Sequence, residues 1–279
     1  MIRPRFAAPL ADEQALRDAV QPRVRDLAGR LPGPEELASA SAEHGVDFAT
    51  TWLHEALLAS AHRPLQSRLD GPLRAPRSSP RLRIVVVPTL FWREHPEIGG
   101  DGQLVLDVAR RLGFTGERAP LRSVGGLEEN GERLLAHLEQ LDAPLALVSL
   151  SKGGFDVKRL VARFAGDPTL ERVSAWANVA GLTGGSPLVD RLFRHPALRL
   201  FWDLYLRWHG GSLASLRGLG ASQAEARQPA AAPAHWRVLS LPALPLRGHL
   251  LPGAVRGFER LAHLGPNDGM VPFWNAVVA

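Results

Sequence analysis

The sequence predicts an α/β protein with a mostly parallel sheet flanked by helices. From residue 82 onward, short apolar runs alternate with longer segments that have apolar residues at helical spacing. The runs are almost continuously apolar, as Ile84-Val85-Val86-Val87 is, which is typical of strands covered on both faces. The chain has 279 residues, 45% of them hydrophobic, so it is long enough to bury such a core.

The region before the sheet is predicted to be a helical extension followed by a linker. Apolar residues at helical spacing predict one helix over residues 12–27 and another that begins near Asp47. Residues 63–80 are rich in proline, arginine and serine, which indicates an extended linker. We therefore expect an N-terminal extension at 1–80 and a sheet domain at 81–279.

Strands and helices alternate along the sheet domain, which predicts parallel pairing with right-handed crossovers. In chain order we expect a strand at 83–88, a helix at 101–112, an extended segment at 118–121, a helix at 127–141, a strand at 145–148, a helix at 155–164, and strands at 173–180 and 237–246. A strongly apolar segment within 186–235 predicts a helical insertion between the last two strands. It either forms a cap over a pocket or packs on the core.

The most informative motif lies between the strand at 145–148 and the helix that follows it. Ser149-Leu150-Ser151-Lys152-Gly153 has the pattern small-x-Ser-x-Gly of a nucleophile elbow. A serine in such a turn takes a strained backbone conformation, so the residues two positions away must be small. The turn would direct the Lys152 amide toward a forming oxyanion. Alternatively, Ser151 caps the following helix in an ordinary turn, and the Lys152 side chain is simply solvated.

From Arg83 to the C-terminus the chain resembles the α/β-hydrolase fold family. Besides the elbow, three segments carry the resemblance. They are the strand end and loop Val87-Pro88-Thr89-Leu90-Phe91-Trp92, the strand and glycine-rich loop at 177–187, and the turn Gly265-Pro266-Asn267-Asp268-Gly269-Met270-Val271-Pro272. The segment at 186–235 occupies the position of the family's cap.

The resemblance implies a serine hydrolase of the esterase or lipase type. It implies that Ser151 is the nucleophile, that Asp268 is the acid of the triad, and that the amides of Leu90 and Lys152 form the oxyanion hole. Asp268 also fits a second interpretation, because Asn-Asp-Gly is a common turn sequence chosen for its backbone tolerance.

The histidine base of the triad is absent from its expected position. The family order places it about twenty residues after the acid, following a last strand. The residues after Asp268 contain no histidine, so we expect this chain to lack both that strand and that base. His249 is the candidate substitute base. Without a base, Ser151 would be a poor nucleophile and the chain would show little turnover.

The expected function is therefore hydrolysis of a carboxylic ester or thioester with an apolar acyl or alcohol part, with no cofactor and no metal. A small-molecule ester or a lipid-like molecule would be the substrate. Two alternatives remain open. One is a non-catalytic ligand-binding protein on the same fold, which the missing histidine favours. The other is an acyltransferase, in which an alcohol replaces water as the acceptor.

Composition excludes several other classes. The chain has no cysteine, which rules out disulfides and thiolate metal sites. Its net charge of +5 comes from scattered arginines without interleaved aromatic residues, so we expect no nucleic-acid partner. No segment is predicted to span a membrane, and we expect a cytoplasmic protein.

The expected lack of the last strand would leave one edge of the sheet uncovered. We therefore expect the chain to self-associate through this edge.

Overall fold

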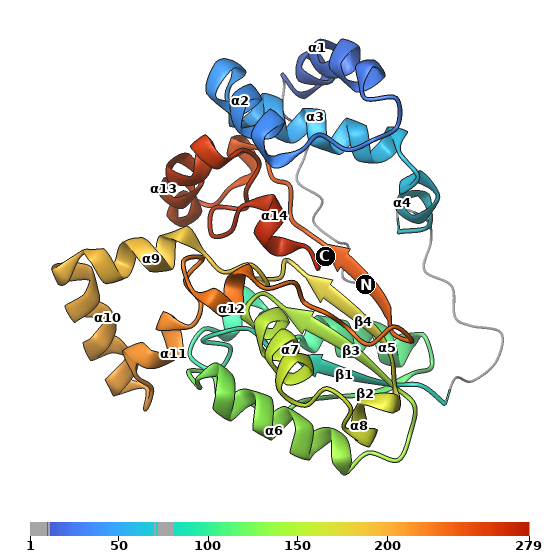
Figure 1. The fold of residues 1–279 in the computed structure, drawn as a ribbon, viewed down its shortest axis with the longest axis vertical. Helices are drawn as coiled ribbons and strands as arrows, with labels where there is room; N and C mark the ends of the chain where they lie inside the picture. The colour runs from blue at the N-terminus through green and yellow to red at the C-terminus, as the bar shows by residue number, and fades with distance from the viewer. Residues whose placement is uncertain (1–9, 11, 70, 72–80, 279) are drawn as a thin grey trace. The chain divides into compact units, whose positions relative to one another are not determined.

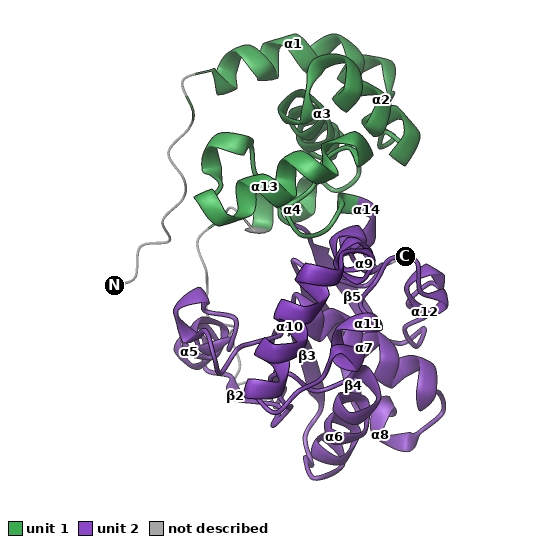
Figure 2. Ribbon diagram, turned by 90° about the vertical axis from the view of Figure 1, so that its left-hand side faces the viewer, with its two compact units in different colours: residues 1–72, 243–273 green, residues 73–242, 274–279 purple. Residues whose placement is uncertain are grey.

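The computed structural model describes residues 10, 12–69, 71 and 81–278 (Figure 1). Contacts divide the chain into two compact units, coloured separately in Figure 2. The helical unit contains residues 1–72 and 243–273, and the sheet unit contains residues 73–242 and 274–279.

This division differs from a boundary near residue 80, because residues 243–273 pack with the N-terminal helices. The hydroxyl of Ser41 donates to the carbonyl of Ala262 at 2.5 Å, and the amide of Arg247 donates to Asp47 Oδ1 at 2.8 Å. A C-terminal segment thus completes the core of the N-terminal unit.

The helical unit is built from short helices. They are α1 (Glu13–Asp26), α2 (Pro34–His44), α3 (Val46–Ala59), α4 (Arg63–Leu69), η2 (Arg247–His249), α13 (Pro252–Leu261) and η3 (Ala262–Leu264). The expected helices at 12–27 and from Asp47 are present as α1 and α3, whereas α2 and α13 were not predicted. The linker prediction is wrong for residues 63–69, which form α4, because Pro64 falls in the first helical turn, where proline is tolerated. The rest of that prediction, at 72–80, lies outside the described residues.

The sheet unit contains five parallel strands in the order β2-β1-β3-β4-β5, which confirms the predicted fold class (Figure 1). The strands are β1 (Arg83–Val87), β2 (Thr115–Arg118), β3 (Leu145–Leu150), β4 (Val173–Val179) and β5 (Arg237–Leu241). The connecting helices are η1 (Pro96–Ile98), α5 (Gln103–Arg111), α6 (Leu127–Glu139), α7 (Lys152–Arg163) and α8 (Pro168–Glu171), and α14 (Phe273–Ala276) follows much later in the chain. The predictions for β1, β3 and β4 agree with the observed bounds within two residues, whereas β2 lies three residues before the extended segment expected at 118–121 and β5 ends at Leu241, five residues before the expected end.

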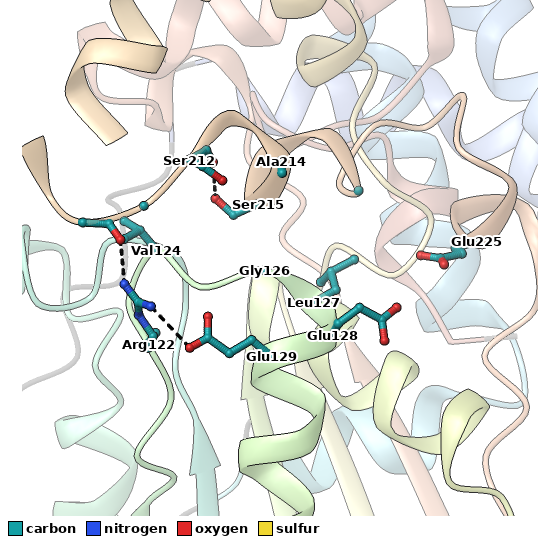
Figure 3. A pocket seen from close by; sticks show the side chains of 13 residues that line it. Arg122, Val124, Gly126, Leu127, Glu128, Glu129, Ser212, Ala214, Ser215 and Glu225 are labelled. Carbon is teal, nitrogen blue, oxygen red and sulfur yellow. Dashed lines mark hydrogen bonds and ion pairs between the residues drawn. The ribbon is translucent and has the colours of Figure 1, made fainter. Parts of the chain in front are cut away.

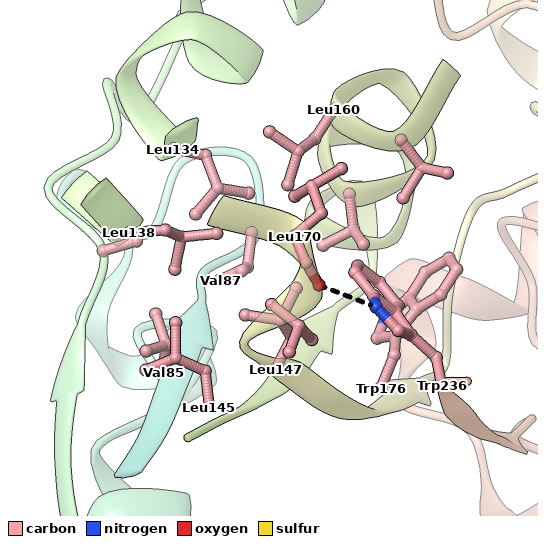
Figure 4. Close-up of a cluster of buried hydrophobic side chains, with 14 of the residues drawn as sticks. Val85, Val87, Leu134, Leu138, Leu145, Leu147, Leu160, Leu170, Trp176 and Trp236 are labelled. Atoms are coloured by element: carbon pink, nitrogen blue, oxygen red, sulfur yellow. Dashed lines mark hydrogen bonds between the residues drawn. The ribbon is translucent and has the colours of Figure 1, made fainter. Parts of the chain in front are cut away.

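The central strands β1 and β3 are largely buried, as their apolar sequences require, whereas the edge strands β2 and β5 contain no buried residue. One face of the sheet packs on α6, α7 and α8 through a large apolar cluster (Figure 4). In β1, Val85 and Val87 belong to this cluster, while Val86 points to the other face, near Gly102 at the start of α5. The indole of Trp236 closes the cluster and donates to the carbonyl of Leu170 at 3.2 Å.

The insertion between β4 and β5 is helical, as predicted. It comprises α9 (Pro187–Arg194), α10 (Pro196–Trp208), α11 (Leu213–Arg217) and α12 (Ala224–Arg227). In α10 only Leu206 is buried, whereas Leu200, Phe201, Leu204 and Trp208 are 59–87% exposed. Because most of its apolar residues face outward, α10 does not simply pack on the core.

Candidate active site

Ser151 lies in a strained turn between β3 and α7. Its φ of 50° and ψ of −115° place it in a region that side chains other than glycine rarely adopt. Three backbone hydrogen bonds fix this conformation. The Ser151 amide donates to the carbonyl of Val179, and the Ser151 carbonyl accepts from the amides of Gly154 and Leu182. The side chain makes no capping hydrogen bond to α7, so the structure does not support the interpretation of Ser151 as a helix cap.

The small residues around Ser151 have separate structural reasons. A Cβ at Gly153 would lie 2.4 Å from the carbonyl oxygen of Val87 and 2.9 Å from that of Pro88. Gly153 therefore lets the start of α7 pack directly on the end of β1. Ser149 is fully buried, where its hydroxyl accepts from the Trp176 indole at 2.8 Å and donates to Asn178 Oδ1 at 3.0 Å. The common form of this motif is Gly-x-Ser-x-Gly, and Ser149 stands at its first glycine. Its hydroxyl links the buried side chains of Trp176 and Asn178 by hydrogen bonds.

In the loop after β1, the amides on either side of Leu90 have acceptors within the chain. The Thr89 amide donates to Gly100 at 3.0 Å and the Phe91 amide donates to Ser123 at 3.2 Å. Between them, the Leu90 amide has no acceptor within the described part of the chain, and the same holds for the Lys152 amide at the start of α7. The positive end of the α7 dipole adds to the attraction for a negative oxygen there. This pattern favours Leu90 over its neighbours as an oxyanion donor.

The side chain of Lys152 is buried, not solvated, which corrects the sequence-based alternative. Its ammonium lies 2.7 and 2.9 Å from the two carboxylate oxygens of Asp156 and 3.2 Å from the carbonyl oxygen of Gly125. The side chains of Lys152 and Asp156 are only 3% and 1% exposed. Burial raises the pKa of the Asp156 carboxyl above its usual range, and the neighbouring Lys152 ammonium partly offsets this rise.

The other lysine of the chain, Lys158, is also buried in α7. Its ammonium donates to the carbonyls of Thr183 at 2.8 Å and Ala226 at 3.2 Å. It thereby ties α7 to the glycine-rich loop after β4 and to α12. Burial lowers the pKa of Lys158 from 10.5 to about 8, with Glu225 opposing the shift.

The lowered pKa of Lys158 predicts a pH-dependent stability. Between about pH 8 and 10.5 the unfolded chain binds more protons at this site than the folded chain, so the free energy of unfolding rises with pH. The slope should reach at most about 1.4 kcal/mol per pH unit. Urea unfolding of the wild type and of Lys158→Met from pH 7 to 10 checks this. As pH rises, the free energy of unfolding of the wild type should increase relative to that of Lys158→Met. If the free energies of the two proteins changed in parallel with pH, the lowered pKa of Lys158 would be contradicted.

Helix α10 of the insertion contacts the loop that carries Leu90. The Trp202 ring stacks on Phe91 with ring centroids 5.7 Å apart, and the Tyr205 ring meets Phe91 edge-on at 5.4 Å. The Tyr205 hydroxyl lies 2.8 Å from His95 Nε2. Because Phe91 itself has a positive φ of 59°, these rings hold a strained residue next to the proposed oxyanion donor. His95 is thus in hydrogen-bond contact with α10.

A cavity of about 430 Å³ opens between the start of α6 and residues 210–218 of the insertion (Figure 3). Arg122 spans one side of it, donating to the carbonyl of Gly210 at 2.6 Å and to Glu129 at 3.4 Å. Its lining is Arg122, Val124, Gly126, Leu127, Glu128, Glu129, Gly210, Gly211, Ser212, Ala214, Ser215, Gly218 and Glu225. Ser151 is not part of this lining.

Asp268 and His249, the proposed acid and substitute base, belong to the helical unit. Asp268 forms the predicted turn, in which its Oδ1 accepts the amides of Met270 at 2.8 Å and Val271 at 2.7 Å. Burial raises its pKa, and these two amides oppose the rise. The Nε2 atom of His249 is buried and has no hydrogen-bond partner among the described residues. Both roles stay proposals.

Asn178, which was not among the site residues predicted from the sequence, organises the loops behind Ser151. It is fully buried in β4, accepts from Ser149, and donates through Nδ2 to the carbonyl of Ala276 at 3.0 Å. A Cβ on Gly154 or Gly181 would lie within 2.3 Å of its side chain. A polar residue within an otherwise apolar strand is the signal that could have identified it.

No group of three or more histidine, aspartate or glutamate side chains in the described ranges could hold a metal ion. None of the helices that the structure describes has both the length and the apolar character needed to cross a membrane.

Comparison with solved structures confirms an α/β-hydrolase-like fold. The crystal structure of the metagenomic carboxyl esterase MGS0156 matches 74% of this chain with a TM-score of 0.57 and 23% identity. The propeptide form of Bacillus licheniformis lipase BlEst2 also matches 74% of the chain, with a TM-score of 0.53 and 20% identity. The matches cover 63% of the first protein and 45% of the second. No family model and no curated protein matches the sequence.

Proposed function

We propose that this protein is a serine hydrolase that cleaves carboxylic esters or thioesters with an apolar acyl or alcohol part. The observation that carries the proposal is the turn at Ser151, strained at φ 50° and not used as a helix cap. A backbone conformation of this kind costs free energy, and such residues cluster at functional sites. The two solved structures compared above are named as a carboxyl esterase and a lipase, which agrees with this class.

In the proposed reaction, Ser151 Oγ attacks the acyl carbon and its proton passes to a base. The amides of Leu90 and Lys152 donate to the oxyanion of the tetrahedral intermediate, where the charge develops. Collapse of the intermediate breaks the bond to the alcohol or thiol, which leaves with the proton held by the base. Water then attacks the acyl-enzyme by the same route and releases the acid.

We propose His249 as the base and Asp268 as the acid that orients it. A general base needs a ring nitrogen that is not already committed, and Nε2 of His249 meets this condition among the described residues. Asp268 uses only Oδ1 to hold the turn, which leaves Oδ2 for an imidazole N–H. The assignment rests on this chemistry, and substitution tests it.

The class of reaction is tested by covalent labelling and by a substrate series. An alkyl fluorophosphonate should label the wild type at Ser151, identified by peptide mass spectrometry, and Ser151→Ala should not be labelled. Among p-nitrophenyl esters, butyrate and hexanoate should give a higher kcat/KM than acetate, because an apolar pocket favours the longer acyl chain. Ser174→Ala, an exposed serine of β4, is the matched control and should be labelled like the wild type.

The same experiment separates the alternatives. Binding of a long-chain ester without labelling or turnover would favour the non-catalytic binder. Formation of a new ester on addition of butanol, in preference to hydrolysis, would favour the acyltransferase. Labelling at a residue other than Ser151 would overturn the nucleophile assignment.

A further inference from the structure

The chain contains only two lysines, and the one that follows Ser151 takes part in a buried ion pair. Replacing such a pair with apolar residues of similar volume is often neutral or even stabilising, because taking two charges out of water is costly. The Lys152–Asp156 pair has an additional contact that apolar residues could not supply. This contact is the hydrogen bond from the Lys152 ammonium to the carbonyl of Gly125.

Gly125 belongs to the segment 122–126, which connects β2 to α6 and is held by the same network. Asn130 accepts from the Arg122 amide at 3.1 Å and donates to the Arg122 carbonyl at 3.2 Å. It also lies 3.4 Å from Asp156 Oδ2. A Cβ on Gly125 would be only 2.6 Å from Asn130 Oδ1, so the segment packs directly on this side chain. Lys152, Asp156 and Asn130 therefore fix segment 122–126 against α6 and α7.

Segment 122–126 in turn holds the loop that carries Leu90. The carbonyl of Ser123 accepts from the Phe91 amide at 3.2 Å, and its hydroxyl accepts from the Arg93 amide at 3.3 Å. The hydroxyl also donates to the carboxylate of Glu94. The hydrogen bond to Phe91 fixes the residue after Leu90, and it is on this residue that the positive φ falls.

We propose that the Lys152–Asp156 pair positions the oxyanion loop, acting through segment 122–126 and without touching the substrate. Lys152 then has two roles: its backbone amide donates to the oxyanion, and its side chain orients the second donor, Leu90. The catalytic consequence rests on the proposed hydrolase function, whereas the effect on the loop does not. A misplaced donor lowers the rate of the chemical step and leaves ground-state binding nearly unchanged.

The test uses variants that separate positioning from charge burial. Lys152→Met leaves a buried carboxyl without its partner and is expected to lower stability. The double variant Lys152→Met with Asp156→Leu removes both charges and should fold, but it still lacks the bond to Gly125. Gly125→Ala displaces the segment from Asn130 and leaves the pair intact. Lys158→Met, at the other buried lysine of α7, is the matched control.

Two readouts are measured on each folded variant. The first is amide hydrogen exchange at Phe91 and Arg93, which requires no activity. The second is kcat and KM for p-nitrophenyl butyrate. In the double variant and in Gly125→Ala, exchange at both amides should become at least about tenfold faster, and kcat should fall by about ten- to a hundredfold with KM within about twofold of the wild type. Lys158→Met should leave exchange at Phe91 unchanged.

The outcomes distinguish this proposal from the proposed function. Wild-type exchange at Phe91 and Arg93 in the double variant would overturn the positioning role, whatever the activity. Faster exchange with wild-type kcat would also overturn it, because the loop would then be displaced without effect on the reaction. Faster exchange in a protein whose wild type cleaves no ester would support control of the loop by the pair and would count against the hydrolase function alone.

Discussion

Ser151→Ala and His249→Ala should each lower kcat for p-nitrophenyl butyrate by about four orders of magnitude, and the double variant should be no slower than either single variant. Nucleophile and base act as one unit, so removing the second after the first has little further effect. The turnover that remains would come from the oxyanion donors and from substrate binding. Stopped assays at high enzyme concentration, with uncatalysed hydrolysis subtracted, measure these rates.

His263→Ala is the matched control for the base. This histidine belongs to the same unit as His249, is exposed, and has its Nδ1 2.9 Å from the carbonyl of Arg260. Its loss should leave kcat within about twofold of the wild type, as expected for a surface substitution. If His249→Ala kept wild-type turnover while Ser151→Ala lost it, the base assignment would be wrong and the nucleophile assignment would stand.

The sheet could be predicted because its central strands are buried on both faces. A run such as Leu145–Leu150 is apolar at almost every position, which fixes its identity as a strand without any tertiary information. The turn at Ser151 could also be predicted, since the requirement for small neighbours is local in sequence. Gly153 satisfies that requirement through its contact with the end of β1.

One of the helices that escaped prediction, α2, lacks a clear apolar stripe. In α2 the buried residues are Leu37, Ala40 and Ser41, and two of these are small residues that give little hydrophobic signal. Its burial depends on partners far along the chain, such as the carbonyl of Ala262. Local periodicity cannot detect a helix whose packing is decided by residues more than two hundred positions away.

The burial of Lys152 could not be predicted for a related reason. Lys152 and Asp156 are four residues apart, a spacing that most often indicates an exposed pair on a helix surface. What buries them is the segment 122–126, which no local pattern connects with α7. The polar networks that shape the candidate site are thus properties of the tertiary fold, whereas the elbow motif is a property of five consecutive residues, 149–153.

Gly153→Ala should destabilise the sheet unit by about 3 kcal/mol or more. The new methyl group would lie 2.4 Å from the carbonyl oxygen of Val87 and 2.9 Å from that of Pro88, and neither atom can move like a flexible side chain. Val87 is fully buried in β1, so relief of the clash requires α7 to shift along the sheet. Urea unfolding followed by tryptophan fluorescence, which reports on the buried Trp176, measures the loss.

Gly131→Ala is the control that isolates the clash from the general effect of replacing a helical glycine. Gly131 is also buried, in α6, but a Cβ there would meet its nearest neighbours, Arg159 Cγ and the Leu160 amide, at 3.8 and 3.9 Å. At this ordinary contact distance, alanine should stabilise the helix by about 0.5–1 kcal/mol. A loss of stability in Gly153→Ala together with a gain in Gly131→Ala would establish that α7 packs in close contact with the end of β1. A Gly153→Ala variant as stable as the wild type would mean that this close approach is not a constraint on the elbow.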